Sequence, residues 1–248
     1  MCGRFSLRVE MEELLKHFGL TEPPGGGFSW TPRYNIAPGQ MIAAVIGAGS
    51  ARRIGAMRWG LVPSWAKDEK IGFKMINARA ETLHEKPAFR GPLVSKRCVI
   101  PADGYYEWRI SDRQPFRITM KDRGLFAMAG LYDVRVREDG TKLGTCTIIT
   151  TDANPLTRGI HHRMPVILDG EAMSVWLDRS VTDAGRLLGL LNPYPAEAMD
   201  LYPVSPIVGN VKNDVPACIE PYDPAADKTG KSPESGSHDG GPMQQELF

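Results

Sequence analysis

The sequence has no long apolar run and few cysteines. No stretch of its 248 residues approaches the ~18 consecutive apolar residues of a membrane-spanning helix, and the N-terminus lacks the basic-then-apolar pattern of a secretory signal. The four cysteines, Cys2, Cys98, Cys146 and Cys218, are widely separated, so the close pairs of metal sites and redox motifs are missing. These absences predict a cytoplasmic protein without a disulfide framework, and we expect neither a metal nor a cofactor.

Net charge is also small, at +1, but it is unevenly distributed. Residues 1–222 carry 28 basic and 24 acidic side chains, whereas residues 223–248 carry two lysines and five acids. The body of the chain is therefore mildly basic, which is compatible with a phosphate-bearing partner.

The composition is that of one well-cored domain over residues 1–222, followed by a tail over residues 223–248. The tail segment "DPAADKTGKSPESGSHDGG" has almost no large apolar residues, so it cannot bury enough surface to offset the entropy of ordering. We expect it to be disordered, up to a final "QQELF" that restores an apolar pair.

Periodicity predicts a helix over residues 8–18, ending at Gly19, and a second helical region in "EAMSVWL" and "DAGRLLGLL". Between them lie short strand-like runs such as "MIAAVI", "LFAMAGLY" and "TCTIITT". This order indicates an α+β fold with a mixed, largely antiparallel, barrel-like β-sheet flanked by helices in a single domain. Nothing in the sequence requires more than a monomer.

The chain begins with "MCGRF". If Met1 is removed, Cys2 carries a free amine and a thiol on adjacent carbons, a combination that no internal cysteine offers. The stretches "GLVPSW", "MINARAETL", "IPADGYYEW" and "IHHRMPVIL" also hold more polar and aromatic residues than packing requires.

Each stretch alone has an ordinary structural interpretation. Asn77 and Arg79 could pair with Glu81 at a strand end, Glu107 could be an exposed strand residue, and His161 and His162 could be loop histidines. The occurrence of all these stretches in one chain is a more specific signal than any single stretch. "MCGRF", "YNIAPG", "WGLVPSW", "NARAET", "ADGYYEW", "IHHRMPVIL" and "VGNVKN" occur in the order and spacing of the SRAP family, the SOS response-associated peptidase-like proteins that process abasic sites. The resemblance covers about residues 2–217.

The resemblance implies that Met1 is removed and that Cys2 traps abasic sites in single-stranded DNA, shielding the lesion during the DNA damage response. Cys2, Asn77, Glu107 and His161 match the active-site positions of the family, whereas His162 occupies a variable position. The positions that match its DNA-contacting residues are Arg4, Pro38, Trp65, Arg79, Trp108 and Arg163.

The chemistry explains these residue types. A free α-amine has a pKa of about 7.7 to 8.0, so it can attack the aldehyde of a ring-opened abasic sugar and form an imine. The adjacent thiol can then close a thiazolidine ring. We expect Glu107 to exchange protons with a raised pKa if it is buried, His161 to titrate near neutrality and protonate the sugar oxygen, and Asn77 to hold the terminus or the sugar in place.

Two other functions are compatible with parts of the pattern. A Cys2-Gly3 start also occurs in N-terminal-nucleophile amidotransferases, but the glutamine-pocket motifs expected of that class are missing. A non-catalytic adaptor for single-stranded DNA is the other alternative. Peptidase activity, which the family name implies, is best interpreted as self-removal of Met1.

The C-terminal residues resemble the bacterial sliding-clamp binding motif, in which a glutamine precedes a Leu-Phe pair. Gln244, Leu247 and Phe248 would be the contact residues, at the end of a flexible arm. An accidental terminal Leu-Phe is the alternative.

Overall fold

The computed structural model describes residues 2–20, 30–49 and 51–227. The strands are β1 (Phe5–Leu7), β2 (Arg33–Ile36), β3 (Met41–Ala48), β4 (Ala51–Trp59), β5 (Asn77–Arg79), β6 (Arg97–Ala102), β7 (Gly104–Trp108), β8 (Pro115–Met120), β9 (Phe126–Val136), β10 (Lys142–Asp152), β11 (Arg163–Pro165), β12 (Ile167–Leu168) and β13 (Met199–Pro203). The α-helices are α1 (Met11–Phe18), α2 (Pro87–Ser95), α3 (Gly170–Leu177), α4 (Ala184–Leu188) and α5 (Pro224–Asp227). Short 3-10 helices include η1 (Glu69–Lys74) and η4 (Pro206–Gly209).

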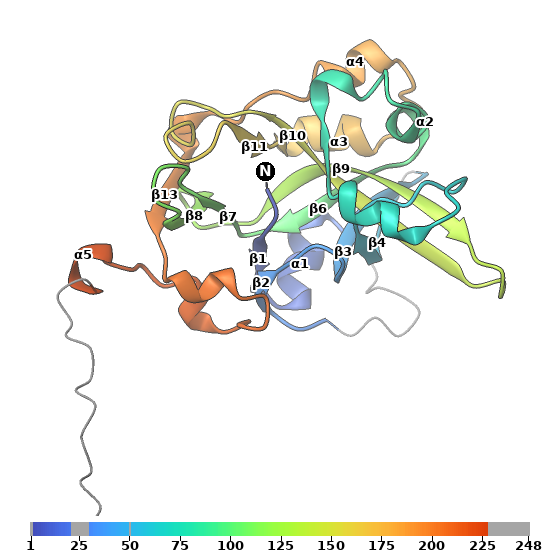
Figure 1. Ribbon diagram of the computed structural model, residues 1–248. Coiled ribbons are helices and arrows are strands. Elements are labelled where there is room, and N and C mark those ends of the chain that lie inside the picture. Colours follow the sequence, from blue (N-terminus) through green and yellow to red (C-terminus); the bar gives the residue numbers. More distant parts are fainter. Residues whose placement is uncertain (1, 21–29, 50, 228–248) are drawn as a thin grey trace, which may run out of the picture.

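Five strands close into a barrel. β10 pairs with β4, β4 with β3, β3 with β6, β6 with β9, and β9 returns to β10. The β10–β4 contact is parallel and the other four are antiparallel, so the barrel is mixed. Helices α2, α3 and α4 lie together on one side of it (Figure 1). The predicted fold class, α+β with a mixed, largely antiparallel barrel in one domain, is confirmed.

A second, antiparallel sheet has the order β13-β8-β7-β1-β2. It holds the N-terminal strand β1 between β7 and β2, near the middle of the molecule (Figure 1). The rings of Phe5 on β1 and Trp59 on β4 meet edge to face at 5.3 Å, which joins this sheet to the barrel.

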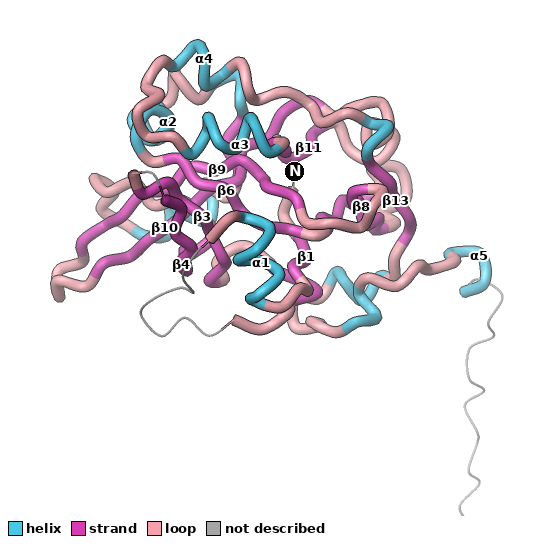
Figure 2. Tube along the Cα trace, turned by 180° about the vertical axis from the view of Figure 1, so that it is seen from behind, coloured by secondary structure: helices cyan, strands magenta, loops and turns pink. Residues whose placement is uncertain are grey.

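The predicted N-terminal helix is present as α1, and it is seen from behind in Figure 2. Leu14 and Phe18 are its buried residues, and Gly19 ends it in the left-handed conformation at φ 63°. α5 directly follows the predicted domain boundary at residue 222, and residues 228–248 lie outside the described part, so the division stays a prediction. None of the helices in the described ranges has the length and apolar character needed to cross a membrane.

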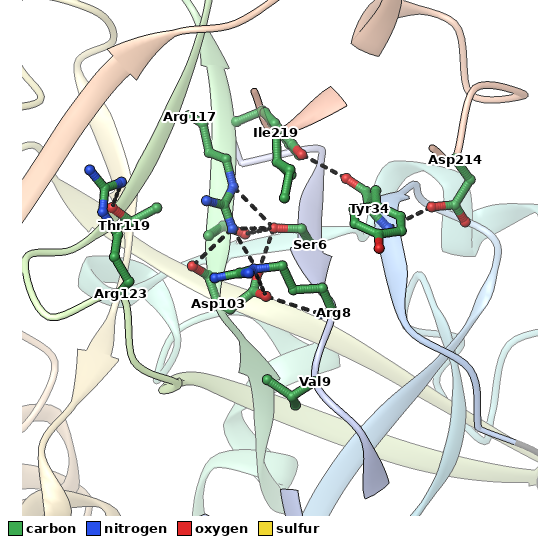
Figure 3. Close-up of polar contacts among 12 residues, drawn as sticks. Ser6, Arg8, Val9, Tyr34, Asp103, Arg117, Thr119, Arg123, Asp214 and Ile219 are labelled. Atoms are coloured by element: carbon green, nitrogen blue, oxygen red, sulfur yellow. Dashed lines mark hydrogen bonds and ion pairs between the residues drawn. The ribbon is translucent and has the colours of Figure 1, made fainter. Parts of the chain in front are cut away.

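A buried polar cluster connects β1 with β7 and β8 (Figure 3). Asp103, just before β7, forms an ion pair with Arg117 of β8 at 2.8 Å and accepts a hydrogen bond from Ser6 Oγ of β1 at 2.6 Å. Its other oxygen accepts from the Arg8 backbone N–H at 3.0 Å. Gly104 makes room for the cluster, because a Cβ there would stand 2.6 Å from Arg117 Nε.

Candidate active site

Cys2, the first described residue, leads into β1 and is fully buried. On the way into β1, the Arg4 carbonyl accepts a hydrogen bond from the Tyr106 N–H at 2.9 Å, and Phe5 lies opposite Tyr105. Because the two strands are antiparallel, residues before Phe5 run alongside residues after Tyr105. This register places Cys2 beside the end of β7 that carries Glu107.

Glu107 is 5% exposed, and burial raises its pKa to about 7. A carboxyl group normally titrates near 4.3, so an ordinary glutamate would be fully ionised at neutral pH. Here both protonation states are populated, and the group can give or accept a proton. The expectation of a buried Glu107 with a raised pKa is met.

The Cys2 thiol lies in the same apolar surroundings. Burial first, and the charge of Glu107 second, raise its pKa far above the ordinary range. The thiol is therefore protonated at neutral pH, and it needs a base before it can react as a thiolate.

Tyr105 is a site residue that the sequence analysis missed. It is fully buried, and burial first, followed by the negative charges of Cys2 and Glu107, raises the pKa of its hydroxyl well above the ordinary range. The available signal was strand alternation, because Tyr105 and Glu107 are two residues apart on β7 and so share a face.

His161 lies on the loop between β10 and β11. Its backbone N–H donates to the Thr157 carbonyl at 3.0 Å, and Nδ1 accepts from the Arg163 N–H at 3.0 Å, so the ring proton sits on Nε2. Ile110, just beyond β7, donates to the Ile160 carbonyl at 3.2 Å. This bond holds the histidine loop against the strand of Glu107.

The expectation that His161 titrates near neutrality is wrong. Its ring is partly buried and stacks on His162 at 4.3 Å between centroids, and burial followed by the proximity of positive charge lowers its pKa to about 4. At neutral pH the imidazole is uncharged, so it can donate a hydrogen bond from Nε2 but is not a ready acid.

Asn77 opens β5, which pairs in parallel with β10. Its amide nitrogen is 3.5 Å from the Ile148 carbonyl, and its Oδ1 is buried without a hydrogen-bond partner among the described residues. The residue before it, Ile76, accepts a hydrogen bond from Trp59 Nε1 at 2.8 Å. Trp59 also packs on Phe5 of β1, the strand that follows Cys2. The Trp59 and Phe5 rings therefore link the segment of Asn77 to the segment of Cys2.

The three predicted DNA-contacting arginines differ in environment. Arg4 is buried, donates to Asn35 Oδ1 at 2.8 Å and to the Val208 carbonyl, and lies 5.6 Å from the centroid of the Trp108 ring. Arg79, at the end of β5, is exposed.

Arg163 is buried and binds carboxylates. Its two terminal nitrogens each reach a Glu81 oxygen at 2.9 Å, and they also contact Asp152 Oδ1 at 2.8 Å and the Thr150 carbonyl at 2.6 Å. These contacts fix the strand that follows His161. Contact of the arginines with DNA stays a prediction.

The other predicted contact residues lie in turns and at strand ends. Pro38, between β2 and β3, is half-buried, Trp108 at the end of β7 is half-buried, and Trp65 after β4 is 63% exposed. Gln244, Leu247 and Phe248 lie outside the described residues.

Comparison with known proteins gives consistent matches. The family model described as SOS response associated peptidase (SRAP) matches residues 1–211. The abasic site processing protein YoqW of Bacillus subtilis (strain 168) is 51% identical over 227 residues, covering 90% of this chain and all of that protein. The abasic site processing protein HMCES of Gallus gallus is 38% identical over 232 residues, covering 79% and 68%. A crystal structure from Bacteroides thetaiotaomicron superposes with a TM-score of 0.81 at 31% identity, covering 89% of this chain and 100% of that one.

Proposed function

The chain belongs to the SOS response associated peptidase (SRAP) family, and on that premise we propose that it processes abasic sites in single-stranded DNA through a covalent link to Cys2. The relatives named abasic site processing proteins support the lesion as substrate. The observation that carries the covalent step is the burial of Cys2 beside a carboxyl group, Glu107, whose pKa is about 7.

The first step needs the Cys2 amine, so Met1 must be removed beforehand. The amine attacks the aldehyde carbon of the ring-opened sugar, and the resulting carbinolamine loses water to give an imine. Protonated Glu107 supplies the proton that leaves with the hydroxyl group. The thiol is not the first nucleophile, because its raised pKa keeps it protonated.

In the second step the thiol adds to the imine carbon. The imine nitrogen has kept its own proton, since the leaving water took its proton from Glu107. A carbon–sulfur bond forms, the thiol proton passes to the Glu107 carboxylate, and the carbon–nitrogen double bond becomes single as its electron pair moves onto the nitrogen. The product is a five-membered thiazolidine ring that contains the nitrogen and sulfur of Cys2. The two steps use opposite protonation states of Glu107, which a pKa near 7 makes available.

His161 and Asn77 act as hydrogen-bonding groups in this proposal. Neutral His161 offers its Nε2–H to a sugar oxygen during ring opening, and the unpartnered Oδ1 of Asn77 accepts from the amine or from an opened-sugar hydroxyl. Neither group needs to change its charge.

Intact-mass spectrometry tests the proposal. The protein is weighed before and after incubation with a single-stranded oligonucleotide that bears one abasic site. We expect a starting mass without Met1 and a product heavier by the oligonucleotide less one water. A Cys2→Ala protein should give no adduct, and an adduct yield equal to that of the unaltered protein would refute the role of Cys2.

Assays of glutamine hydrolysis and of DNA binding separate the alternatives. An N-terminal-nucleophile amidotransferase would release ammonia from glutamine, and a non-catalytic adaptor would bind DNA equally well after Cys2→Ala and leave no denaturation-resistant complex. The peptidase activity is proposed to be self-removal of Met1. It predicts that Glu107→Gln protein retains Met1 when cellular methionine removal is blocked.

We also propose that the C-terminal residues Gln244, Leu247 and Phe248 bind a bacterial sliding clamp. The protein is further proposed to be a cytoplasmic monomer, associated with the nucleoid if it is bacterial. A short apolar anchor on a linker raises the local concentration of the domain near replicating DNA. Equal clamp affinity after deletion of residues 244–248 would contradict this.

A further inference from the structure

Two aromatic side chains are strongly exposed in the segment that joins β4 to β5. Trp65 is 63% exposed and Phe73, at the end of η1, is 71% exposed. Phe73 lies only four residues before Asn77. Proteins that hold single strands offer such rings as stacking surfaces for bases. Trp65 matches a family contact position, whereas Phe73 is not among the positions identified from the sequence.

A cavity of about 320 Å³ opens beside the Phe73 ring. Pro38, Gly39, Trp59, Gly60 and Gly72 are among the residues that line it. This volume is at the lower end of the range for small-molecule sites, so it suits one planar ring system.

Two glycines that line this cavity allow two backbone segments to approach each other closely. At Gly60, where φ is +127°, a Cβ would lie 2.7 Å from the Gly72 carbonyl oxygen, and a Cβ on Gly72 would lie 2.8 Å from the Gly60 oxygen. The two backbone segments can therefore approach only if both residues lack side chains. A Cβ on Gly39 would be 3.6 Å from Phe73 Cε1, so the Phe73 ring stands directly against this turn.

The cavity is next to the candidate active site. Trp59, which lines the cavity, contacts Phe5, which follows Cys2 by three residues, and it donates a hydrogen bond to the carbonyl of Ile76, which precedes Asn77. One layer of side chains thus separates the cavity from the Cys2 strand and from β5. A ligand group that neighbours the reacting sugar could therefore enter the cavity.

The rim of the cavity is positively charged. Glu69 forms ion pairs with Arg58 at 2.9 Å and with Arg137 at 2.7 Å, and hydrogen bonds from these guanidinium groups lower its pKa to about 2. Two cations share one anion, which leaves one positive charge. Lys70 and Lys74 are exposed on the same 3-10 helix. Such a rim attracts a phosphate backbone.

We propose that this cavity receives the nucleobase of the nucleotide next to the abasic site, stacked on the Phe73 ring, with the adjoining phosphate at the Lys74 side. The position next to the lesion rests on the proposed function. The base contact itself is independent of crosslinking, because it can be measured on undamaged single strands.

The first test is the affinity for an intact single-stranded oligonucleotide, measured by fluorescence anisotropy. Phe73→Ala should weaken binding by about 5- to 100-fold, the range expected for loss of one base–aromatic stack, and Phe73→Trp should restore it. Val136→Ala is the matched control, since Val136 is 62% exposed at the end of β9. It should bind as the unaltered protein does. Equal affinity of the Phe73→Ala and unaltered proteins would overturn the inference.

The second test locates the base. Abasic oligonucleotides carry the fluorescent base 2-aminopurine on the 5′ or the 3′ side of the lesion. We expect stacking to quench one of the two, and Phe73→Ala to abolish that quenching. Fluorescence that is independent of Phe73 at both positions would overturn the inference. If the unaltered protein forms no adduct but binding to intact strands still depends on Phe73, the proposed function fails and the base site stands.

Discussion

Glu107 combines a strand position with an apolar environment, and the combination determines its chemistry. It sits on β7 two residues after Tyr105, on the same face of the strand, and only 5% of it is exposed. The penalty for burying a charge raises its pKa to about 7, where the group can act as acid and as base in successive steps.

The pH dependence of adduct formation should be bell-shaped. The rate rises as the Cys2 amine loses its proton, with a reference pKa of about 7.7 to 8.0, and falls as Glu107 ionises with a pKa of about 7. The maximum should lie between about pH 7 and 8. Glu107→Gln should lower the rate and remove the fall at high pH. Initial adduct rates from denaturing gels across the pH range test this, and an alkaline fall that persists in Glu107→Gln would contradict it.

The same pKa predicts a cost in stability. The Glu107 carboxyl group is protonated in the folded state up to about pH 7 but ionises near 4.5 in the unfolded chain, so the folded state loses stability as the pH rises from 4.5 to 7. At about 1.4 kcal/mol per pKa unit, the loss is about 3 kcal/mol above pH 7. Glu107→Gln should therefore raise the free energy of unfolding by about this amount at pH 8.

Urea unfolding at two pH values checks the sign. Between about pH 8 and pH 5, the advantage of Glu107→Gln should shrink to about 1 kcal/mol or less, because folded Glu107 is protonated at the lower pH. An advantage of the same size at both pH values would mean that the substitution acts through packing and not through charge.

At the scale of elements, the position of β1 determines whether Cys2 and Glu107 meet. The Asp103 cluster fixes this position, since Asp103 binds Ser6 of β1 and the backbone of Arg8 directly after β1, as well as Arg117 of β8 (Figure 3). Asp103 and Arg117 have side-chain exposures of 1% and 2%. A buried pair of this kind adds little net stability over apolar residues, but removing one partner leaves the other charge uncompensated.

Asp103→Ala should therefore lower the free energy of unfolding by about 3 to 5 kcal/mol, measured by urea denaturation. The matched control is Asp112→Ala. Asp112 pairs with Arg109 at 2.6 Å on the surface, where solvent screens the interaction, and its loss should change stability little. Equal effects of the two substitutions would show that the buried cluster does not hold β1.

Local patterns predicted the elements better than their pairing. The apolar spacing and Gly19 predicted α1, and the short β-branched runs predicted strands. The pairing of Phe5 with Tyr105 joins residues far apart in the chain, and no local period encodes such a contact. The pairing of β10 with β4, which closes the barrel, also joins residues far apart in the chain and is likewise not encoded by a local period. The family resemblance, and not periodicity, brought Cys2 and Glu107 together in advance.

Side-chain environments were the least predictable feature of the site. The low pKa of His161 follows from burial and from the charges around its ring, and the burial of Arg163 follows from the approach of Glu81 on a different segment. Both depend on tertiary contacts. Residue type suggested a histidine that titrates near neutrality, and the family resemblance suggested a DNA-contacting arginine.

At the scale of the whole molecule, exposed arginines can bind DNA, whereas buried arginines stabilise the fold. Residues 1–222 carry a modest excess of basic groups. The exposed fraction of the arginine side chains differs widely. Arg163 is 7% exposed and engaged with carboxylates, whereas Arg79 is exposed two residues after Asn77. An exposed guanidinium beside the site can release counterions when it meets a phosphate, but one already paired with carboxylates contributes less to this effect.

Arg79→Ala should weaken binding to single-stranded DNA and make the slope of log affinity against log salt shallower by about 0.7, the value for one phosphate contact. Arg163→Ala should instead lower the thermal midpoint, because Glu81 and Asp152 lose their shared partner, while the slope changes less. Anisotropy titrations at several salt concentrations, paired with thermal melts, measure both quantities. An unchanged slope in Arg79→Ala, or a full phosphate-sized change in Arg163→Ala without loss of stability, would reverse the assignment and make the buried arginine the DNA contact.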